Sequence, residues 1–276
     1  MKSRCLSVQT ALLVAVLATT VSSAQAELVY SPYFASANVA GDIGSPAALP
    51  VKQARTDFLD MVTGVKTETL EGIAAGTSAS GAKLFGGSVT IVPPATGEIT
   101  NVTDNGSGAT GRFNTTAGCD LATACNFLET AYNFTLDFGG NYSAFAFFGT
   151  DFSDFNGSIY LDLLERDSSG NLVTVAGTHI LISGPVGSGA LVLVDGTGDG
   201  SLLHFGLTDN ARAYAGVSFS VLQTATDPIN YDYLGFDDLA LGTFAGAPVP
   251  EPATLALVAL SLAGLAASRR KAQPKR

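Results

Sequence analysis

The sequence predicts an all-β fold for most of its length, of the β-sandwich or jelly-roll-like type. Three observations support this prediction. Valine, isoleucine, threonine, phenylalanine and tyrosine recur in short runs, glycine is abundant with 31 residues, and tryptophan is absent. Turn signals separate these runs at intervals typical of sandwich strands. We therefore expect one domain of many short strands.

One short helix is expected before the strands, over residues 50–62. Its periodicity places Val51, Ala54, Phe58, Leu59 and Val62 on one face, and Gly64 would stop it.

Strands are expected from residue 67 onward, and one hairpin is expected over 159–175. The strand candidates are 88–92, 132–138, 144–148, 159–165, 172–175, 179–182, 190–194, 202–206, 216–222 and 233–241. The turn signals that separate them are Pro93-Pro94, Asp104-Asn105-Gly106, Gly139-Gly140, Asn156-Gly157, Ser169-Gly170-Asn171 and Asp195-Gly196.

The start of the chain has the pattern of a secretory signal peptide. Lys2 and Arg4 form a charged region, residues 11–21 are apolar, and Ala24-Gln25-Ala26 is a cleavage signal. We therefore expect export, removal of residues 1–26 and a mature chain that begins at Glu27.

The end of the chain has the pattern of a short membrane anchor. Prolines at 248, 250 and 252 precede an uncharged run over 253–268, and a basic tail follows. As a helix this run would reach about 24 Å, enough for a thin bilayer, with the basic tail on the cytoplasmic side. The expected division is a signal peptide at 1–26, a β-sandwich domain at 27–242, a linker at 243–248 and a C-terminal segment at 249–276.

This C-terminal segment resembles the PEP-CTERM sorting signal of exopolysaccharide-producing Gram-negative bacteria. The matching residues are Val249, Pro250, Glu251, Pro252, Thr254, Leu255, Arg269, Arg270 and Lys271. The resemblance implies an exosortase-type membrane protease as partner and cleavage near Pro-Glu-Pro. It also implies an inner-membrane precursor with a transmembrane sorting helix, and then a place at the cell surface or outside the cell, in association with exopolysaccharide.

Phrases within the domain also resemble a recurrent subgroup of these proteins. They are residues 67–72, 145–157, 203–207 and 235–239. This resemblance implies residence at the surface or in the matrix and implies little chemistry.

The mature chain keeps two cysteines, Cys119 and Cys125, since Cys5 leaves with the signal peptide. A close pair in an oxidising compartment predicts a disulfide. A metal or redox pair is the alternative, and the five intervening residues and the lack of a nearby histidine weigh against it.

The composition argues against several functions. Residues 27–247 hold seven basic and 23 acidic side chains, a formal charge of −16, which disfavours binding to nucleic acid. His179 and His204 are expected on strand faces with ordinary hydrogen bonds. A nucleophile elbow, a zinc cluster and a complete phosphate-binding loop are all missing from the sequence. A carboxylate pair for glycoside hydrolysis stays open.

Two acidic clusters are candidate calcium sites. Asp195, Thr197 and Asp199 have the spacing of the first half of an EF-hand loop, although position twelve is Gly206 and not Glu. The second cluster is Asp237-Asp238 in the last expected strand, with Glu71 as the expected partner. In each case an ordinary turn or a solvent-exposed carboxylate is the alternative.

The sequence therefore predicts a non-enzymatic, exported protein of the cell surface or extracellular matrix. A calcium-dependent carbohydrate-binding module is the first alternative, and a secreted glycoside hydrolase is the second.

Overall fold

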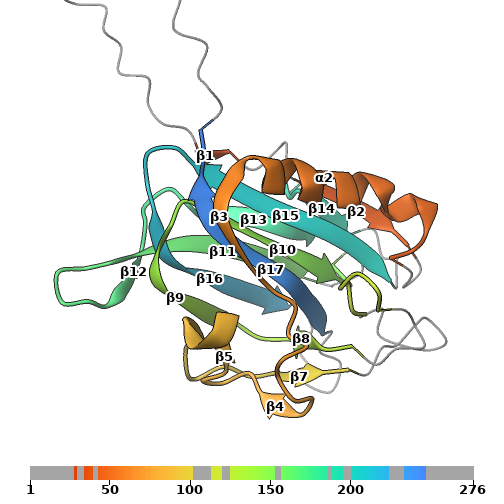
Figure 1. Cartoon of the computed structure of the whole chain (residues 1–276), viewed down its shortest axis with the longest axis horizontal. Helices are drawn as coiled ribbons and strands as arrows, with labels where there is room; N and C mark the ends of the chain where they lie inside the picture. Colours follow the sequence, from red (N-terminus) through yellow and green to blue (C-terminus); the bar gives the residue numbers. More distant parts are fainter. Residues whose placement is uncertain are drawn as a thin grey trace, which may run out of the picture.

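In the part of the chain that the structure describes, two β-sheets pack face to face and one α-helix lies on the outside of the sandwich (Figure 1). The computed structural model describes residues 28–29, 34–39, 43–101, 113–119, 125–152, 157–185, 188–194, 200–223 and 233–246. The all-β prediction with one short helix is confirmed.

Sheet A contains nine of the described strands. They are β1 (Leu28–Val29), β2 (Ala35–Asn38), β3 (Val62–Glu68), β4 (Thr77–Ser78), β7 (Glu98–Thr100), β8 (Phe127–Thr130), β10 (Ala144–Thr150), β15 (Ser201–Asp209) and β17 (Leu234–Phe244). Its central order is β15-β10-β17-β8, and all its pairs are antiparallel.

Sheet B contains the other eight. They are β5 (Lys83–Leu84), β6 (Val89–Ile91), β9 (Phe134–Tyr142), β11 (Gly157–Arg166), β12 (Leu172–Thr174), β13 (Ile180–Pro185), β14 (Val192–Val194) and β16 (Tyr214–Gln223). Its central order is β13-β11-β16-β9, and β14 joins β13 in parallel. Together the two central orders give the strand arrangement of a jelly roll.

The core lies between the sheets and is rich in phenylalanine. Phe147 and Phe236 of sheet A meet Phe219 of sheet B, with ring centroids 5.3 Å (Phe147–Phe219) and 5.1 Å (Phe219–Phe236) apart. All three side chains are buried. Because side chains alternate along a strand, the neighbours of Phe147 point to the opposite face of sheet A.

The helix α2 (Leu49–Asp60) covers that opposite face. Phe58 is fully buried and packs on Ala144, Ala146 and Ala240 of sheet A. The small alanine side chains let the helix lie close to the strands. Figure 1 shows α2 lying across β15 and β2.

The predicted stop of this helix was wrong. The helix ends at Asp60, with Met61 donating its N–H to the carbonyl of Phe58, and β3 begins at once at Val62. Gly64 lies inside β3 with a φ of +62°, so it bends the strand and does not cap the helix. Val51, Ala54 and Phe58 are buried as expected.

All ten predicted strands are confirmed, and so is the predicted hairpin, which pairs β11 with β12. The turn predicted at Gly139-Gly140 was wrong, because β9 runs through both glycines. A Cβ at Gly139 would lie 2.3 Å from the carbonyl oxygen of Ser88, so the close approach of two backbones requires glycine there.

Both ends of the chain fall outside the described residues. The predicted signal peptide at 1–26 and the segment at 249–276 are among them. Strand β17 continues to Phe244, two residues beyond the expected end of the domain at 242. Within the described part of the chain, every helix is too short or too polar to cross a bilayer.

Candidate functional site

A β-bulge in β17 turns two neighbouring aspartates to the outer face of sheet A. The register between β10 and β17 shifts between Ala146 and Phe148, and Asp238 has a φ of +46°. Phe236 and Leu239, on either side of the aspartates, both point into the core. An extra residue in a strand re-aims side chains in this way, which is why Asp237 and Asp238 leave the core together.

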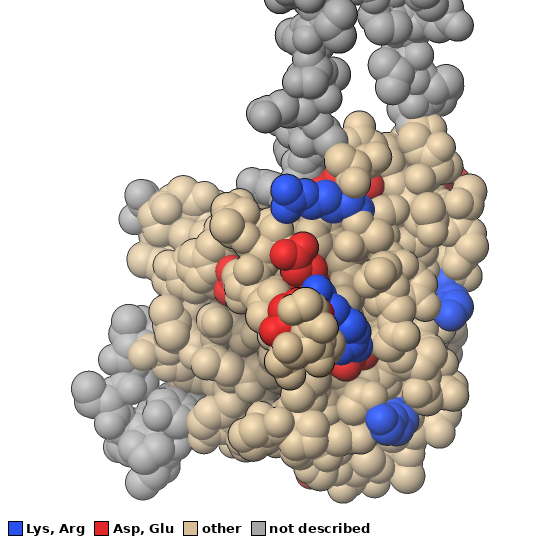
Figure 2. All heavy atoms as spheres, turned by 90° about the vertical axis from the view of Figure 1, so that its left-hand side faces the viewer, with Lys and Arg blue, Asp and Glu red and all other residues tan. Residues whose placement is uncertain are grey.

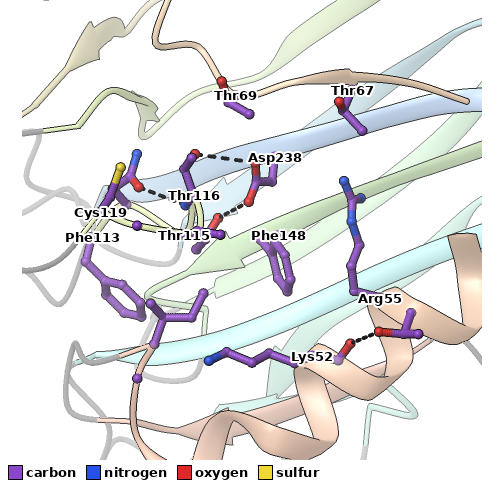
Figure 3. Close-up of a pocket in the computed structure, with 16 residues that line it drawn as sticks. Lys52, Arg55, Thr67, Thr69, Phe113, Thr115, Thr116, Cys119, Phe148 and Asp238 are labelled. Atoms are coloured by element: carbon purple, nitrogen blue, oxygen red, sulfur yellow. Dashed lines mark hydrogen bonds between the residues drawn. The ribbon is translucent and has the colours of Figure 1, made fainter.

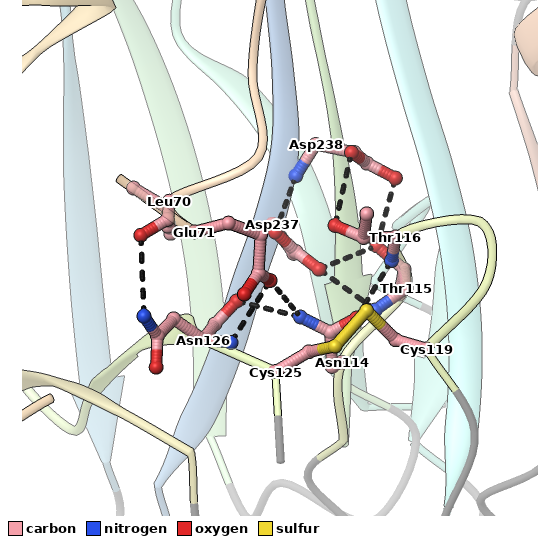
Figure 4. The surroundings of a disulfide bond; sticks show 10 residues. All are labelled: Leu70, Glu71, Asn114, Thr115, Thr116, Cys119, Cys125, Asn126, Asp237 and Asp238. Atoms are coloured by element: carbon pink, nitrogen blue, oxygen red, sulfur yellow. Dashed lines mark hydrogen bonds between the residues drawn. A yellow bond between two sulfur atoms is a disulfide. The ribbon is translucent and has the colours of Figure 1, made fainter. Parts of the chain in front are cut away.

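Asp237 holds the disulfide segment, which we define as residues 113–119 and 125–126. Its Oδ2 accepts hydrogen bonds from the backbone N–H of Thr115, at 2.7 Å, and from the Thr115 hydroxyl, at 3.0 Å (Figure 4). Its Oδ1 accepts from the backbone N–H of Asp238 at 2.7 Å. Both oxygens of this buried carboxylate are therefore occupied.

Glu71, which lies three residues after the end of β3, holds the same segment. Its Oε1 accepts hydrogen bonds from the Asn114 side-chain amide, at 3.1 Å, and from the backbone N–H of Asn126, at 2.9 Å. Asn126 in turn donates from its side chain to the carbonyl of Ile73 at 2.7 Å. Glu71 and Asp237 thus fix neighbouring residues of the disulfide segment onto sheet A.

The predicted disulfide between Cys119 and Cys125 is confirmed, with Cα atoms 5.9 Å apart. Glu71 lies beside it, so that a carboxylate oxygen and the two sulfur atoms fall within 4.8 Å of one another. These sulfur atoms are bonded to each other and are not thiolates, which are the form of cysteine that binds metal. The group therefore does not make a metal site while the disulfide is intact.

Burial raises the pKa of both aspartates. The pKa of Asp237 lies well above its usual range because the carboxyl is fully desolvated and because Asp238 stands beside it. Desolvation also raises the pKa of Asp238, while the positive charge of Arg55 lowers it. Hydrogen bonds from the disulfide segment favour the charged form of the two aspartates, whereas burial disfavours it.

A pocket of about 670 Å³ opens between α2 and the disulfide segment, and we call it the helix–loop pocket. Lys52, Arg55 and Thr56 of α2 form one wall. Asp238 and Phe148 line it from sheet A, and the disulfide segment and Thr67 and Thr69 complete it (Figure 3). The hydroxyls of Thr115 and Thr116 lie 3.5 Å and 3.4 Å from the Asp238 carboxylate, so those bonds are long.

Arg55 is the most distinctive group of this pocket. Its guanidinium carbon lies 5.6 Å from the ring centroid of Phe148, a cation–π contact that orients the side chain. Its Nη1 is buried and has no hydrogen-bond partner among the residues that the structure describes. Figure 3 shows Arg55 reaching from α2 toward the strand that carries Asp238, while Lys52 points toward Phe113.

A family model for the PEP-CTERM protein-sorting motif matches residues 248–271. The chain carries a PEP-CTERM sorting motif. The match spans the Pro-Glu-Pro and the basic residues Arg269, Arg270 and Lys271. The motif implies export, processing by an exosortase, and a place at the cell surface or outside the cell. Its residues lie outside the described part of the chain.

One solved structure similar to this chain is the crystal structure of the K2 cleaved adhesin domain of Lys-gingipain. The TM-score is 0.36 at 15% sequence identity, over 65% of this chain and 98% of that chain. A likeness of this extent says nothing about ligand or activity. No curated protein matches the chain significantly.

The structure describes only two of the predicted calcium residues, Glu71 and Asp237. Asp195, Thr197 and Asp199 lie outside the described residues. Glu71 and Asp237 do meet at one place, but both accept hydrogen bonds from the disulfide segment. Calcium binding by this PEP-CTERM protein stays a prediction.

The expected placement of the histidines on strand faces holds only for His204, which lies in β15, whereas His179 directly precedes β13. His179 stacks on Tyr160, with centroids 4.2 Å apart, and its Nδ1 lies 2.8 Å from the Asp162 carboxylate. His204 is buried in β15 with its ring near Phe58 and Phe148.

Sequence reasoning missed Lys52 and Arg55 as site residues. A signal for them was present, because only seven basic side chains occur in residues 27–247 and these two stand three positions apart on one helix. Residues three apart share a helix face. Their position over Phe148 and Asp238 depends on tertiary packing and could not be read from the sequence.

Proposed function

We propose that this PEP-CTERM protein is a non-enzymatic protein of the cell surface or extracellular matrix that binds exopolysaccharide in the helix–loop pocket. The observation that carries the proposal is that Arg55 and Asp238 both line a cavity of about 670 Å³, one from the helix and the other from sheet A. A polysaccharide presents hydroxyl groups that both donate and accept, and a donor-only guanidinium opposite a carboxylate matches that chemistry.

The size and lining of the pocket favour a sugar-sized ligand. Ligand pockets have volumes of about 300 to 1,000 Å³ and combine apolar walls with a few placed polar groups. Here Phe113 and Phe148 provide apolar surface, and threonine hydroxyls add further hydrogen-bonding groups. The threonines are short and lose little conformational freedom when they bind.

The face of the molecule seen in Figure 2 offers less to such a ligand. Near the centre of that view lysine and arginine side chains lie beside aspartate and glutamate side chains, on a surface that is mostly uncharged (Figure 2). In sheet B, Arg166 and Asp137 form such an ion pair, with Nη2 of the arginine 2.5 Å from Oδ1 of the aspartate. Each charge is therefore already compensated by the other. Such an ion pair attracts a polar ligand less strongly than Arg55, which forms no ion pair among the described residues.

The sorting motif gives the proposal its cellular setting. We expect the exosortase to cut the membrane-anchored precursor near Pro250–Pro252 and to release or transfer the β-domain. Changing Glu251 and Pro252 together to alanine should leave an uncut precursor in the membrane, as judged by fractionation and intact mass. Delivery of that double variant to the surface at the mass of the processed wild type would contradict this part of the proposal.

The binding test uses the full chain, purified in detergent, and exopolysaccharide from the producing cell. Isothermal titration should show binding that Asp238→Asn weakens and that Asp162→Asn, a control on sheet B, leaves unchanged. Absence of binding, or equal loss from both variants, would overturn the proposal. Release of reducing sugar ends during the incubation would instead support a glycoside hydrolase, and loss of binding on chelation would support the calcium-dependent module.

A further inference from the structure

We infer that the sugar unit bound in the helix–loop pocket carries a carboxylate, so that the ligand is an acidic polysaccharide built from uronic acid units. This inference rests on the proposed function and narrows its ligand. The ligand carboxylate would be bound by the Arg55 guanidinium, and the ring hydroxyls of the same unit would be bound by Asp238 and the threonines.

The placement of charge is the first argument. Residues 27–247 contain seven basic and 23 acidic side chains, yet the described lining of this pocket contains two basic residues, Lys52 and Arg55, and a single acidic one, Asp238. The pocket is therefore a locally cationic site on an acidic protein. Such a site attracts an anionic group that the rest of the surface repels.

The state of Arg55 is the second argument. Among the described residues it forms no ion pair, although Asp238 and Asp237 are near enough to act on it electrostatically. The Asp238 carboxylate faces the hydroxyls of Thr115 and Thr116, and Asp237 is occupied by Thr115. The planar fork of a guanidinium matches a carboxylate through two parallel hydrogen bonds.

A neutral sugar would satisfy this pocket less well. Hydroxyl groups can accept from Arg55, but hydrogen bonds to an ionised acceptor are about twice as strong as those between neutral groups. The Phe148 ring holds the guanidinium in place. The donors are thus oriented before the ligand arrives, which favours a charged acceptor in one position.

The test compares two ligands that differ only in the carboxylate. The full chain in detergent is titrated with a panel of uronic acid oligomers, and with the same oligomers after reduction of each carboxyl to a primary alcohol. We expect the acidic form to bind at least about tenfold more tightly, since charge-assisted hydrogen bonds replace neutral ones. The preference should shrink as sodium chloride is raised.

Arg55→Gln tests the assigned residue, and Arg212→Gln is the matched control. Gln keeps the first methylene groups of the side chain but loses the charge, whereas Arg212 is exposed and lies outside this pocket. Arg55→Gln should remove the preference for the acidic oligomer, so that the acidic and the reduced forms bind with about equal affinity. Arg212→Gln should keep the preference.

The outcomes separate the two proposals. Equal affinity of the wild type for acidic and reduced oligomers would overturn the acidic ligand and leave polysaccharide binding intact. A preference for the acid that falls equally in Arg55→Gln and Arg212→Gln would show general charge attraction and overturn the assigned site. Failure of the whole panel, while exopolysaccharide from the producing cell still binds, would overturn the inference alone. If Arg55→Gln does not fold, the comparison of acidic and reduced oligomers with the wild type still tests the acidic ligand. Lys52→Gln, which removes the other positive charge of the pocket, should then reduce the preference for the acidic oligomer.

Discussion

The outer faces of the two sheets differ in what covers them. On sheet A, Ala144, Ala146 and Ala240 lie beneath Phe58 of α2, and every residue of β10 is buried. On sheet B, the outward residues of β11, Ser158, Tyr160 and Asp162, are partly exposed. One face is thus packed against a second layer, and the other meets solvent.

This difference explains where the pocket lies. A bare sheet face presents side chains at regular spacing and forms no deep hollow. The helix and the disulfide segment stand above sheet A at some distance from each other, and the helix–loop pocket is the space between them. The covering layer also buries Asp237, so this charge on sheet A acts in a less polar medium than the exposed charges of sheet B.

The largest difference in stability between the two faces is expected at Phe58, which packs α2 against sheet A. Phe58→Ala removes a fully buried ring between α2 and sheet A and should lower the free energy of unfolding by about 3 to 5 kcal/mol. Tyr160→Ala on sheet B should cost less, since that ring is partly exposed. Urea denaturation of both variants measures this, and equal losses would mean that the helix is not a structural part of sheet A.

The disulfide should contribute the next largest effect. Replacing Cys119 and Cys125 together by serine should lower stability by about 2 kcal/mol, because the bond closes only a short loop of the unfolded chain. Intact mass under alkylation, with and without reductant, should also show the loss of two hydrogens in the native protein. Two free thiols in the exported protein would rule the bond out.

The aspartate pair makes the sheet A face sensitive to pH. Burial raises the folded-state pKa of Asp237 and Asp238 above the unfolded value of about 3.9. Their contribution to stability is therefore full below that value and is lost as the pH rises through the folded-state pKa values.

The variant Asp237→Asn isolates this effect because it cannot ionise at position 237. Relative to the wild type, it should gain stability as the pH rises from 4 to 7.5, by at most about 1.4 kcal/mol per pH unit. Urea denaturation at several pH values checks the trend. Parallel stability curves for the two proteins would show that Asp237 does not resist ionisation in the folded state.

The smallest effect is expected on the open face. His179 pairs with Asp162, but its side chain is 58% exposed, and such pairs contribute less than about 1 kcal/mol. His179→Ala should therefore lower the unfolding free energy by less than that amount, even with its stacking on Tyr160 included. A loss as large as that of Phe58→Ala would remove the distinction between the two faces.

Much of the fold could be predicted from the sequence because its long strands are rich in residues that favour β structure. In β11 the apolar residues Ile159, Leu161 and Leu163 alternate with polar ones, which is the pattern of a sheet with one solvent-exposed face. In β10 the run from Ala144 to Thr150 gives no alternation, so the sequence predicts a strand there but not the helix above it.

Other features depended on contacts between distant segments. Strands β4 and β5 have two residues each and no apolar run, so pairing with a neighbour creates them. The disulfide was predicted because two cysteines close together in an exported chain indicate a bond without any knowledge of the fold. The pocket was not predicted, since its residues come from α2, β3, β10, β17 and the disulfide segment, which meet only after folding.

Hydrogen–deuterium exchange with and without bound oligosaccharide tests most directly the claim that the covered face is the binding face. We expect added protection in the full chain at residues 113–119 and at α2, with unchanged exchange in β11 and β16. Under the same conditions Arg55→Gln should show less protection with an acidic oligomer. Protection confined to β11 and β16 would contradict the account, because the ligand would then bind the open face of sheet B.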